Sequence, residues 1–332
     1  MLTRGLARRR QECARGQVRG RSRQPDHAQD FRCRVRIPDK RRQLGIHVNQ
    51  KRDLLEAVRG ISTIPTIPTV LEKITLLLQN PQTSAEEIGR AITTDQSLAS
   101  KVLKLVNSAF YGFPGKISTI THAVVILGFS TIKNIVLTAS IFDVFRKKGH
   151  RYAGFDMEKF WFHSIACGAA SQSVAKFIGS SEREEAFIAG LIHDVGKIIE
   201  CQYLEKEFTQ IVRETQQKNQ LFFDSEKQLF EVTHQEIGGL LCQSWNLPEN
   251  LQNAVKYHHN PSKSRSHYLT TAIVHCADIL VRAMDLGNGG DNKIPRMSDQ
   301  VWQSLGLENL SLQSLLENVN DEVEKTTIFM QI

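Results

Sequence analysis

The sequence lacks the features that mark secreted, disulfide-rich and membrane-spanning proteins. It has no run of about 18 apolar residues, the length that a membrane helix needs, so we expect no membrane span. No apolar segment followed by small residues stands near its start, as a secretory signal would require. The six cysteines show no CxxC spacing, and four of them lie in apolar helical patterns, which is typical of buried thiols in a reducing cytoplasm. We therefore expect a cytoplasmic location. The cysteines are Cys13, Cys33, Cys167, Cys201, Cys242 and Cys276.

Acidic residues are scarce at the start of the chain. Residues 1–43 hold fourteen Lys and Arg against four acids, a net charge of +10, which leaves −3 of the chain's +7 for residues 44–332. We interpret residues 1–50 as a basic, disordered leader, because so few aliphatic residues cannot offset the entropy of ordering. It resembles an arm for nucleic acid or anionic lipid, a transit peptide, or an extension that is not native. We favour the last interpretation, so nucleic acid is not an expected partner.

Chemically reactive side chains are also scarce in the first folded half, residues 55–147. Ser84 and Glu87 form a capping box that predicts a helix start, and Asp95 predicts another. Gly128 predicts a break between helices at 121–127 and 130–145. The aromatic loop Phe110–Phe113 is either a partner-binding surface or packing between helices. This half is therefore interpreted as a helical scaffold or recognition bundle.

Candidate metal ligands gather in the second half, residues 148–285. His193 and Asp194 are adjacent and follow an apolar run, where a bare carboxylate is costly unless something binds it. Neutral imidazole and carboxylate are both good ligands for divalent metals. The pair alone is more often an ordinary core feature, but other candidates stand on apolar helices before and after it. Because scattered buried polar groups would be costly, we expect these side chains to converge on one site. The candidates are His163, His193, Asp194, His234, His258, His259 and Asp278.

The end of the chain, residues 286–332, carries no recognisable chemistry. Gly287–Asp291 predicts a flexible loop, and amphipathic helices are expected at 298–305 and 310–326.

Four motifs of the first half resemble those of the HDOD family, the HD-related output domain. The resemblance extends from about residue 61 to 282 and implies an all-α fold. It also implies a regulatory or output module of bacterial signalling, with no general enzymatic activity attached. The motifs are IPTVL at 67–71, DQSLA at 95–99, VNSAFYG at 106–112 and ISTITHAVVILG at 117–128.

The order of the candidate ligands resembles that of the wider HD superfamily of metal-dependent phosphohydrolases. By this resemblance, the ligands of its single-metal centre are His163, His193, Asp194 and Asp278. The extra histidines of its two-metal branch, which contains the HD-GYP phosphodiesterases, match His234 and one or both of His258 and His259. In that branch Asp194 would bridge the two metals.

Two further positions bear on catalysis. By the same resemblance Lys197 contacts a substrate phosphate; the alternative is a solvated lysine at a helix end. The HD-GYP branch carries Gly-Tyr-Pro after its paired histidines, whereas this chain has Asn260-Pro261-Ser262. Hydrolysis of cyclic di-GMP is therefore not expected.

We predict an all-α protein in which an N-terminal helical bundle packs on an HD-type helical core. Its predicted function is a signal-transduction module that acts through protein–protein contacts and has an HD-type metal site. The alternative is a metal-dependent phosphohydrolase acting on a nucleotide or cyclic dinucleotide, with Lys197 as the one candidate for a phosphate contact. The expected cofactor is a divalent metal, and the ligand types suit Fe, Mn, Zn or Mg. The expected partners are signalling proteins, with a nucleotide or cyclic dinucleotide as a further ligand.

Overall fold

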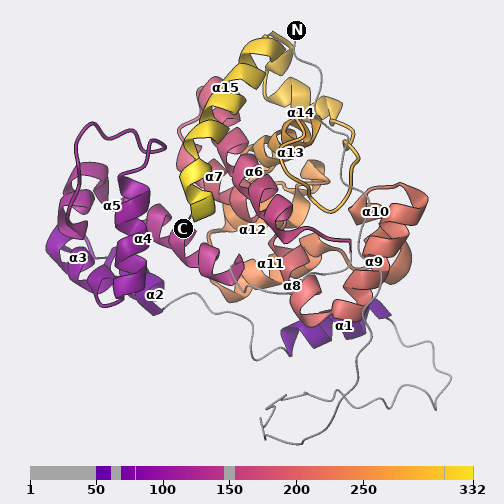
Figure 1. Cartoon of the computed structure of the whole chain (residues 1–332), viewed down its shortest axis with the longest axis horizontal. Helices are drawn as coiled ribbons and strands as arrows, with labels where there is room; N and C mark the ends of the chain where they lie inside the picture. Colours follow the sequence, from indigo (N-terminus) through magenta and orange to yellow (C-terminus); the bar gives the residue numbers. More distant parts are fainter. Residues whose placement is uncertain (1–49, 61–68, 79, 146–153, 310, 332) are drawn as a thin grey trace, which may run out of the picture. The chain divides into compact units, whose positions relative to one another are not determined.

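All the regular elements that the structure describes are helices, which confirms the predicted all-α class. The computed structural model describes residues 50–60, 69–78, 80–145, 154–309 and 311–331, and these residues contain no strand (Figure 1). The predicted leader lies outside them except for Gln50. The α-helices are α1 (Gln50–Arg59), α2 (Thr69–Leu78), α3 (Ala85–Thr93), α4 (Gln96–Val106), α5 (Ile120–Phe145), α6 (Met157–Phe177), α7 (Arg183–Ile192), α8 (Val195–Tyr203), α9 (Glu205–Lys218), α10 (Phe222–Phe230), α11 (His234–Ser244), α12 (Glu249–Tyr257), α13 (Tyr268–Ala283), α14 (Asp299–Ser304) and α15 (Leu312–Lys325). Three 3-10 helices complete them: η1 (Pro261–Lys263), η2 (Leu307–Asn309) and η3 (Thr327–Gln331).

The helix starts predicted in the first half are confirmed. Ser84 and Glu87 form the capping box of α3, with the Ser84 amide donating to the Glu87 carboxylate at 2.8 Å. The Asp95 carboxylate accepts from the Leu98 amide at 3.0 Å and caps α4. Gly128 interrupts α5 with a φ of 82°, a backbone conformation that glycine adopts without strain. The break was therefore visible in the sequence.

Helix α5 corrects the expectation that no segment is long and apolar enough to span a membrane. Over Ile120–Ile141 it meets both criteria, because polar residues such as Thr131 and Lys133 are too widely spaced to break the apolar average. Half of this stretch is buried inside the protein, and Gly128 breaks it. A core helix passes the same test, so length and composition alone are weak evidence of a membrane span.

The aromatic side chains of the loop before α5 are partly buried and pack against the hydrophobic core. The Phe110 ring lies 4.7 Å from that of Phe187 on α7 and 5.3 Å from that of Phe329 on η3, between centroids. Of the two interpretations of this loop, packing between helices therefore holds for Phe110. The described residues form one unit by their contacts, and the boundaries at 147 and 285 stay predictions.

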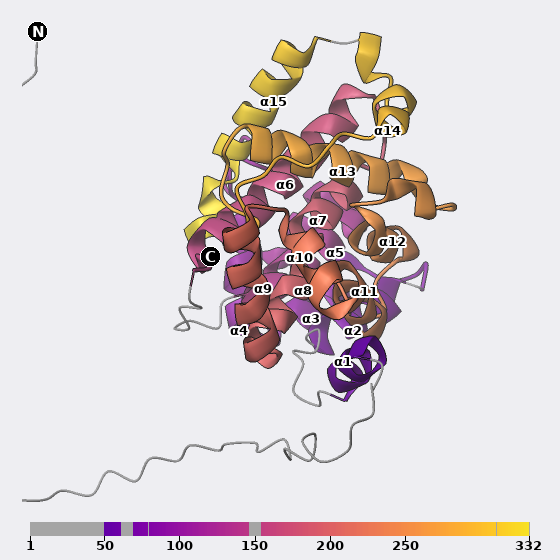
Figure 2. The ribbon, with the colours of Figure 1, turned by 90° about the vertical axis from the view of Figure 1, so that its right-hand side faces the viewer.

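Helix α6 lies at the centre of the second half and packs against α7, α13 and α15 (Figures 1 and 2). Small side chains let these helices approach closely, since Ala166, Ala169 and Ala170 are all fully buried. Helices α9 and α10 lie side by side as an antiparallel pair (Figure 2). The candidate ligands therefore belong to helices that are already held together by apolar packing.

Helices α8 and α11 touch backbone to backbone at Gly196. A Cβ atom there would overlap the His234 carbonyl, and Gly196→Ala is therefore expected to destabilise the protein by about 1–3 kcal/mol. Gly239→Ala is the matched control, because its Cβ would meet only the Lys256 side chain at 3.4 Å. The control should be neutral or stabilising by up to about 1 kcal/mol. Urea unfolding measures both; equal stability of the two variants would contradict the close approach.

Candidate metal centre

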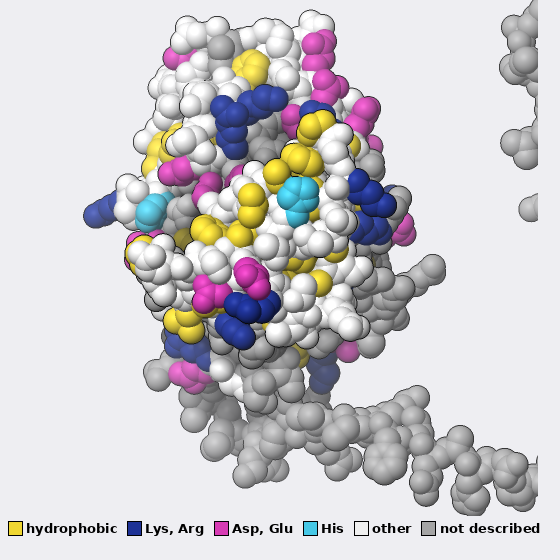
Figure 3. Space-filling view, turned by 90° about the vertical axis from the view of Figure 1, so that its left-hand side faces the viewer, with side chains coloured by type: hydrophobic (Ala, Val, Ile, Leu, Met, Phe, Trp, Pro, Cys, Tyr) yellow, Lys and Arg dark blue, Asp and Glu magenta, His cyan; other side chains and the backbone are white. Residues whose placement is uncertain are grey.

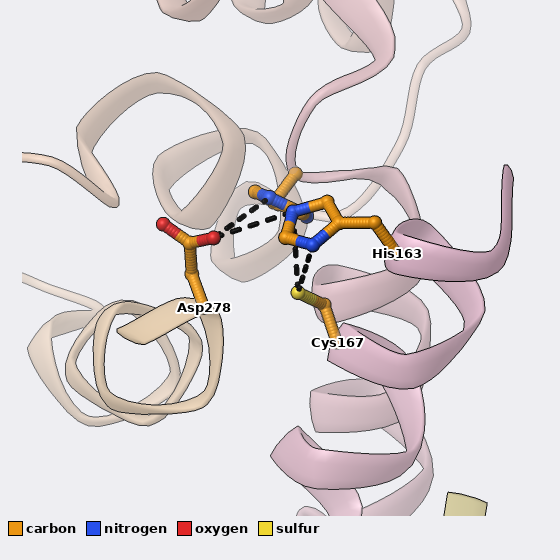
Figure 4. Close-up of side chains that lie close together, drawn as sticks. His163, Cys167 and Asp278 are labelled. Carbon is orange, nitrogen blue, oxygen red and sulfur yellow. Dashed lines mark hydrogen bonds and ion pairs between the residues drawn. The ribbon is translucent and has the colours of Figure 1, made fainter. Parts of the chain in front are cut away.

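Helix α6 carries two side chains of the site on its buried face. His163 and Cys167 are one helical turn apart and so project from the same side of the helix. His163 is 1% exposed and Cys167 is fully buried, and Cys167 Sγ lies 3.6 Å from His163 Nε2. In Figure 4 the His163 ring points toward Asp278 of α13, and the Cys167 sulfur lies against that ring. His163 Nε2 lies 3.3 Å from Asp278 Oδ1.

His193 and Asp194 occupy the junction between α7 and α8, and both are fully buried. The chain changes direction there, so the two side chains enter the interior from neighbouring helix ends. His193 Nδ1 donates to the Gly190 carbonyl at 2.7 Å, which leaves Nε2 turned toward the site. That Nε2 atom lies 3.3 Å from Asp194 Oδ2 but makes no hydrogen bond with it.

The remaining histidines come from the start of α11 and the end of α12. His234 Nε2 lies 3.1 Å from Asp194 Oδ1 and 3.3 Å from His258 Nε2. His258 Nδ1 donates to the Val255 carbonyl at 2.9 Å. The His259 ring, which is less buried, lies 4.2 Å from the His258 ring between centroids.

All seven predicted candidates therefore lie in one cluster, divided into two neighbouring sets of donors. In each set the donor atoms lie within 4.8 Å of one another. Asp194 stands between the sets, since its Oδ2 atom is also 3.8 Å from His163 Nε2. The first set, called the α6 group, is His163, Cys167, His193 and Asp278. The second, called the α11 group, is Asp194, His234, His258 and His259.

The donors fit a divalent metal, because several acceptors face one another without hydrogen atoms between them. His234 and His258 each donate from Nδ1, so in the neutral ring each Nε2 carries a lone pair. These lone pairs face each other and Asp194 Oδ1 across 3.1–3.7 Å. Asp194 Oδ1, His193 Nε2 and His259 Nε2 have no hydrogen-bond partner, which is costly in a buried site. A cation bound among these atoms would offset both the repulsion between the facing lone pairs and the cost of the unpaired buried acceptors.

The electrostatics of the cluster keep four of its histidines in the neutral form that metal ligands need, and His193 is the exception. Burial lowers the pKa of His163, of His258 and of His259, and that of His234 to about 4, so these rings are neutral. For His193, burial also acts to lower the pKa, but the charge of Asp194 outweighs it and the pKa is raised.

The two carboxylates of the cluster stay ionised despite their burial. Burial alone would raise the pKa of Asp194, but His193 and Lys197 hold it well below the usual value. Burial likewise opposes ionisation of Asp278, and the Arg282 guanidinium overcomes it, so that pKa is also well below the usual value. Burial and neighbouring carboxylates raise the pKa of the Cys167 thiol, which a bound cation would counteract.

Lys197 is buried, so its interpretation as a solvated helix-end lysine is wrong. The side chain is 1% exposed, and Nζ donates to Asp194 Oδ2 at 2.6 Å and to the Gly289 carbonyl at 2.8 Å. Two of the three N–H donors of Lys197 are thus engaged, so a phosphate contact, the other predicted role, would have to use the third N–H of a side chain that is 1% exposed.

The glycine-rich loop before α14 was expected to be flexible and without chemistry, but it covers the α6 group. A Cβ atom on Gly289 would lie 3.1 Å from His163 Nε2 and 2.8 Å from the Arg282 guanidinium. Asp291 anchors the loop by accepting from Arg282 Nη1 at 3.0 Å, while Arg282 Nε donates to Asp278 Oδ1 at 2.9 Å. The loop therefore closes the site on this side.

Sequence reasoning missed Cys167, Arg282, Gly289 and Glu226. The first two were detectable, because each stands four residues after a predicted ligand and so on the same helix face. Gly289 and Glu226 gave no comparable signal, since they reach the site only through the packing of the loop and of α10.

Glu226 of α10 fixes the orientation of His234. Its Oε1 atom accepts from the His234 amide at 2.8 Å, and its Oε2 atom accepts from His234 Nδ1 at 2.8 Å. When Glu226 is ionised, Nδ1 carries the ring proton and Nε2 is free as a donor to a metal. Burial raises the pKa of Glu226 well above its usual value and that of neighbouring Glu200 to about 8.

Glu226→Gln should weaken metal binding by about 10–100-fold, as loss of a partner behind a metal ligand typically does. When the glutamine oxygen accepts from the His234 amide, its NH2 group faces Nδ1 and drives the ring proton to Nε2. Nitrogen NMR of the metal-free protein reports the tautomer, and metal titration reports the affinity. Glu200→Gln is the control, since it alters the neighbouring buried carboxyl. An unchanged tautomer in Glu226→Gln would contradict this role.

Comparison with known proteins identifies the family and the fold of the chain. The HDOD domain family model matches residues 64–261, which confirms the resemblance predicted from the motifs. An uncharacterized protein of Treponema pallidum (strain Nichols) is 26% identical over 238 residues, covering 71% of this chain and 45% of that protein. The chain thus spans less than half the length of this curated relative.

Two solved structures show the same fold. An HDOD domain protein of unknown function from Geobacter sulfurreducens aligns with a TM-score of 0.65 and 24% identity, covering 85% of this chain and 95% of that one. A protein from Shewanella amazonensis SB2B, provisionally named a phosphohydrolase, aligns with a TM-score of 0.64 and 22% identity, covering 84% and 98%. At these identities the likeness extends to the fold alone.

Proposed function

Because the chain belongs to the HDOD family, we propose that it is a regulatory module of bacterial signal transduction that acts through contacts with other signalling proteins. Its HD-type centre binds a divalent metal in a structural or sensing role, and it does not turn over a phosphate ester. We also propose a reducing, cytoplasmic location, in keeping with the four free, buried cysteines among the described residues.

The observation that carries this proposal is the burial of the centre together with the engagement of Lys197. Six of the seven predicted ligands are at most 2% exposed, and the Gly289 loop closes the α6 group. The Lys197 ammonium, which a phosphate would contact, already uses two of its three N–H donors on Asp194 and Gly289. A hydrolase needs an open position at its metal, whereas a structural site is closed.

The first half offers a surface suited to protein contacts. Four large apolar side chains of α2 and α5 are exposed there: Leu76 (66%), Val125 (67%), Ile126 (42%) and Phe129 (39%). Figure 3 shows hydrophobic side chains gathered near the middle of the face that it draws, with charged side chains around them. Exposed apolar patches of this kind commonly mark interaction sites.

The residues that would hold the metal come from α6, α11 and α13, the junction of α7 and α8, and the end of α12. A bound divalent ion would neutralise the facing acceptors and tie these elements together. Lys197 and Arg282 hold Asp194 and Asp278 in place from the other side. The Gly289 loop excludes water from the α6 group.

A metal-dependent phosphohydrolase acting on a nucleotide or cyclic dinucleotide is the second candidate. The partial exposure of His259 favours it, because a ligand can approach the α11 group from that side. The absence of Gly-Tyr-Pro after His258 and His259 speaks against a cyclic dinucleotide.

One assay distinguishes the two candidate functions. Protein purified without chelators and loaded with Mn or Fe is incubated with phosphodiester and nucleotide substrates. We expect no turnover above that of the metal ion in buffer. Metal-dependent turnover that disappears in Asp194→Ala would contradict the regulatory proposal and support the hydrolase.

A further inference from the structure

The α6 group contains a donor that differs chemically from the rest of the cluster, the thiol of Cys167. A cysteine alone indicates no site. Here, however, a second atom points to a ligand in the same place, because His193 Nε2 is fully buried, faces this group and has no hydrogen-bond partner. The Asp278 carboxylate supplies the anionic oxygen, and His163 supplies the second nitrogen.

Two of the separations between these donors match those of a tetrahedral site, and all four donors lie within 4.8 Å of one another. With metal–sulfur bonds of about 2.3 Å and metal–nitrogen or metal–oxygen bonds of about 2.0–2.1 Å, tetrahedral ligand atoms lie roughly 3.3–3.6 Å apart. The Cys167 Sγ to His163 Nε2 distance is 3.6 Å, and the His163 Nε2 to Asp278 Oδ1 distance is 3.3 Å. His193 Nε2 lies 3.8 Å from the same Asp278 oxygen. Sγ also lies 3.9 Å from His163 Nδ1, so the thiol lies against the His163 ring, as Figure 4 shows, and joint ligation requires a rotation of one of these two side chains.

The other anionic candidate for this position is already engaged. Asp194 Oδ2 accepts from the buried Lys197 ammonium at 2.6 Å, and its Oδ1 atom is directed to the α11 group, 3.1 Å from His234 Nε2. An ammonium so close to Oδ2 repels a cation that would use the same oxygen. Sγ of Cys167 has no cationic partner of this kind at hydrogen-bonding distance, since its close polar neighbours are the two His163 ring nitrogens.

We propose that Cys167 is a metal ligand, so that the α6 group binds one divalent ion through two imidazoles, one thiolate and one carboxylate. The inference rests on the proposed metal site and specifies its chemistry. Thiolate and imidazole donors suit Zn, Co or Fe(II), whereas Mg and Mn prefer sites built of oxygen atoms. The α6 group therefore selects a thiophilic ion, and binding releases the thiol proton.

Cobalt(II) loading of the whole chain tests the proposal without any activity assay. Thiolate ligation gives a near-ultraviolet sulfur-to-cobalt charge-transfer band, and bound cobalt of any ligation gives visible d–d bands. We expect both in the unaltered protein. Cys167→Ser should lose the charge-transfer band and bind zinc about 10–100-fold more weakly, while Cys242→Ser, also buried and free, should keep the band.

The possible outcomes distinguish a failure of thiolate ligation by Cys167 from a failure of the metal site as a whole. Visible bands without a charge-transfer band in the unaltered protein would show metal binding but overturn thiolate ligation. A charge-transfer band that persists in Cys167→Ser would assign it to another cysteine and also overturn the inference. No bound cobalt under any loading condition would overturn the metal site itself. Because the first result is read on the unaltered chain, it does not depend on the folding of a variant.

Discussion

Asp194→Ala is expected to lower the free energy of unfolding by about 3–5 kcal/mol even in metal-free protein. The reason is the Lys197 ammonium, which is 1% exposed and would lose its counter-charge at 2.6 Å. A buried charge without a partner is far more costly than the pair is stabilising. Denaturant unfolding in the presence of a chelator separates this effect from any loss of metal.

A double-mutant cycle identifies the unpaired ammonium as the cause. Asp194→Ala combined with Lys197→Met removes both charges, so it should recover a large part of the stability lost in Asp194→Ala. The pH dependence has a definite sign. The pKa of Asp194 is held well below its usual value. The contribution of the ionised Asp194 side chain to the free energy of unfolding is therefore complete above about pH 3.9 and is lost as the pH falls further. A double variant no more stable than Asp194→Ala would contradict the pairing.

Metal removal is expected to have the second largest effect. At a free metal concentration of about 100 times Kd, binding to the folded state adds about 2.7 kcal/mol, which chelation removes. The ion would join donors from helices far apart in the sequence, so its loss loosens their packing. Thermal unfolding with and without chelator measures the change.

His234→Ala provides the control for this experiment. It removes a central donor of the α11 group and should shrink the chelator effect, because less metal is held in the first place. If the chelator lowered the unfolding temperature equally in both proteins, its effect would not come from the α11 group. No shift in the unaltered protein would contradict a stabilising metal.

Local signals in the sequence accounted for the helices and for the members of the cluster. Ser84 with Glu87, Asp95 and Gly128 set helix ends through bonds within a few residues, and such bonds can be inferred from the sequence. The seven candidate ligands were recognisable by type and order, because buried histidines and carboxylates need partners. Their convergence follows from the same physical argument.

Features made by long-range packing could not be predicted in this way. Whether Lys197 is solvated or buried depends on the Gly289 carbonyl, 92 residues later in the chain. The Gly287–Asp291 stretch has the composition of a mobile loop, and only its bonds to Arg282 and Lys197 show that it closes the site. Helix α5 was misjudged for a different reason, since apolar composition alone does not distinguish a core helix from a membrane span.

The central claim is that this buried cluster holds a divalent metal. Elemental analysis of protein purified without chelators tests it most directly, with Asp194→Ala and His234→Ala analysed alongside. The account predicts at least one divalent ion per chain, with less metal in Asp194→Ala, because Asp194 stands between the two groups, and less in His234→Ala when the α11 group is occupied. A folded protein that contains no metal, before or after loading with Zn, Fe, Mn or Co, would contradict it.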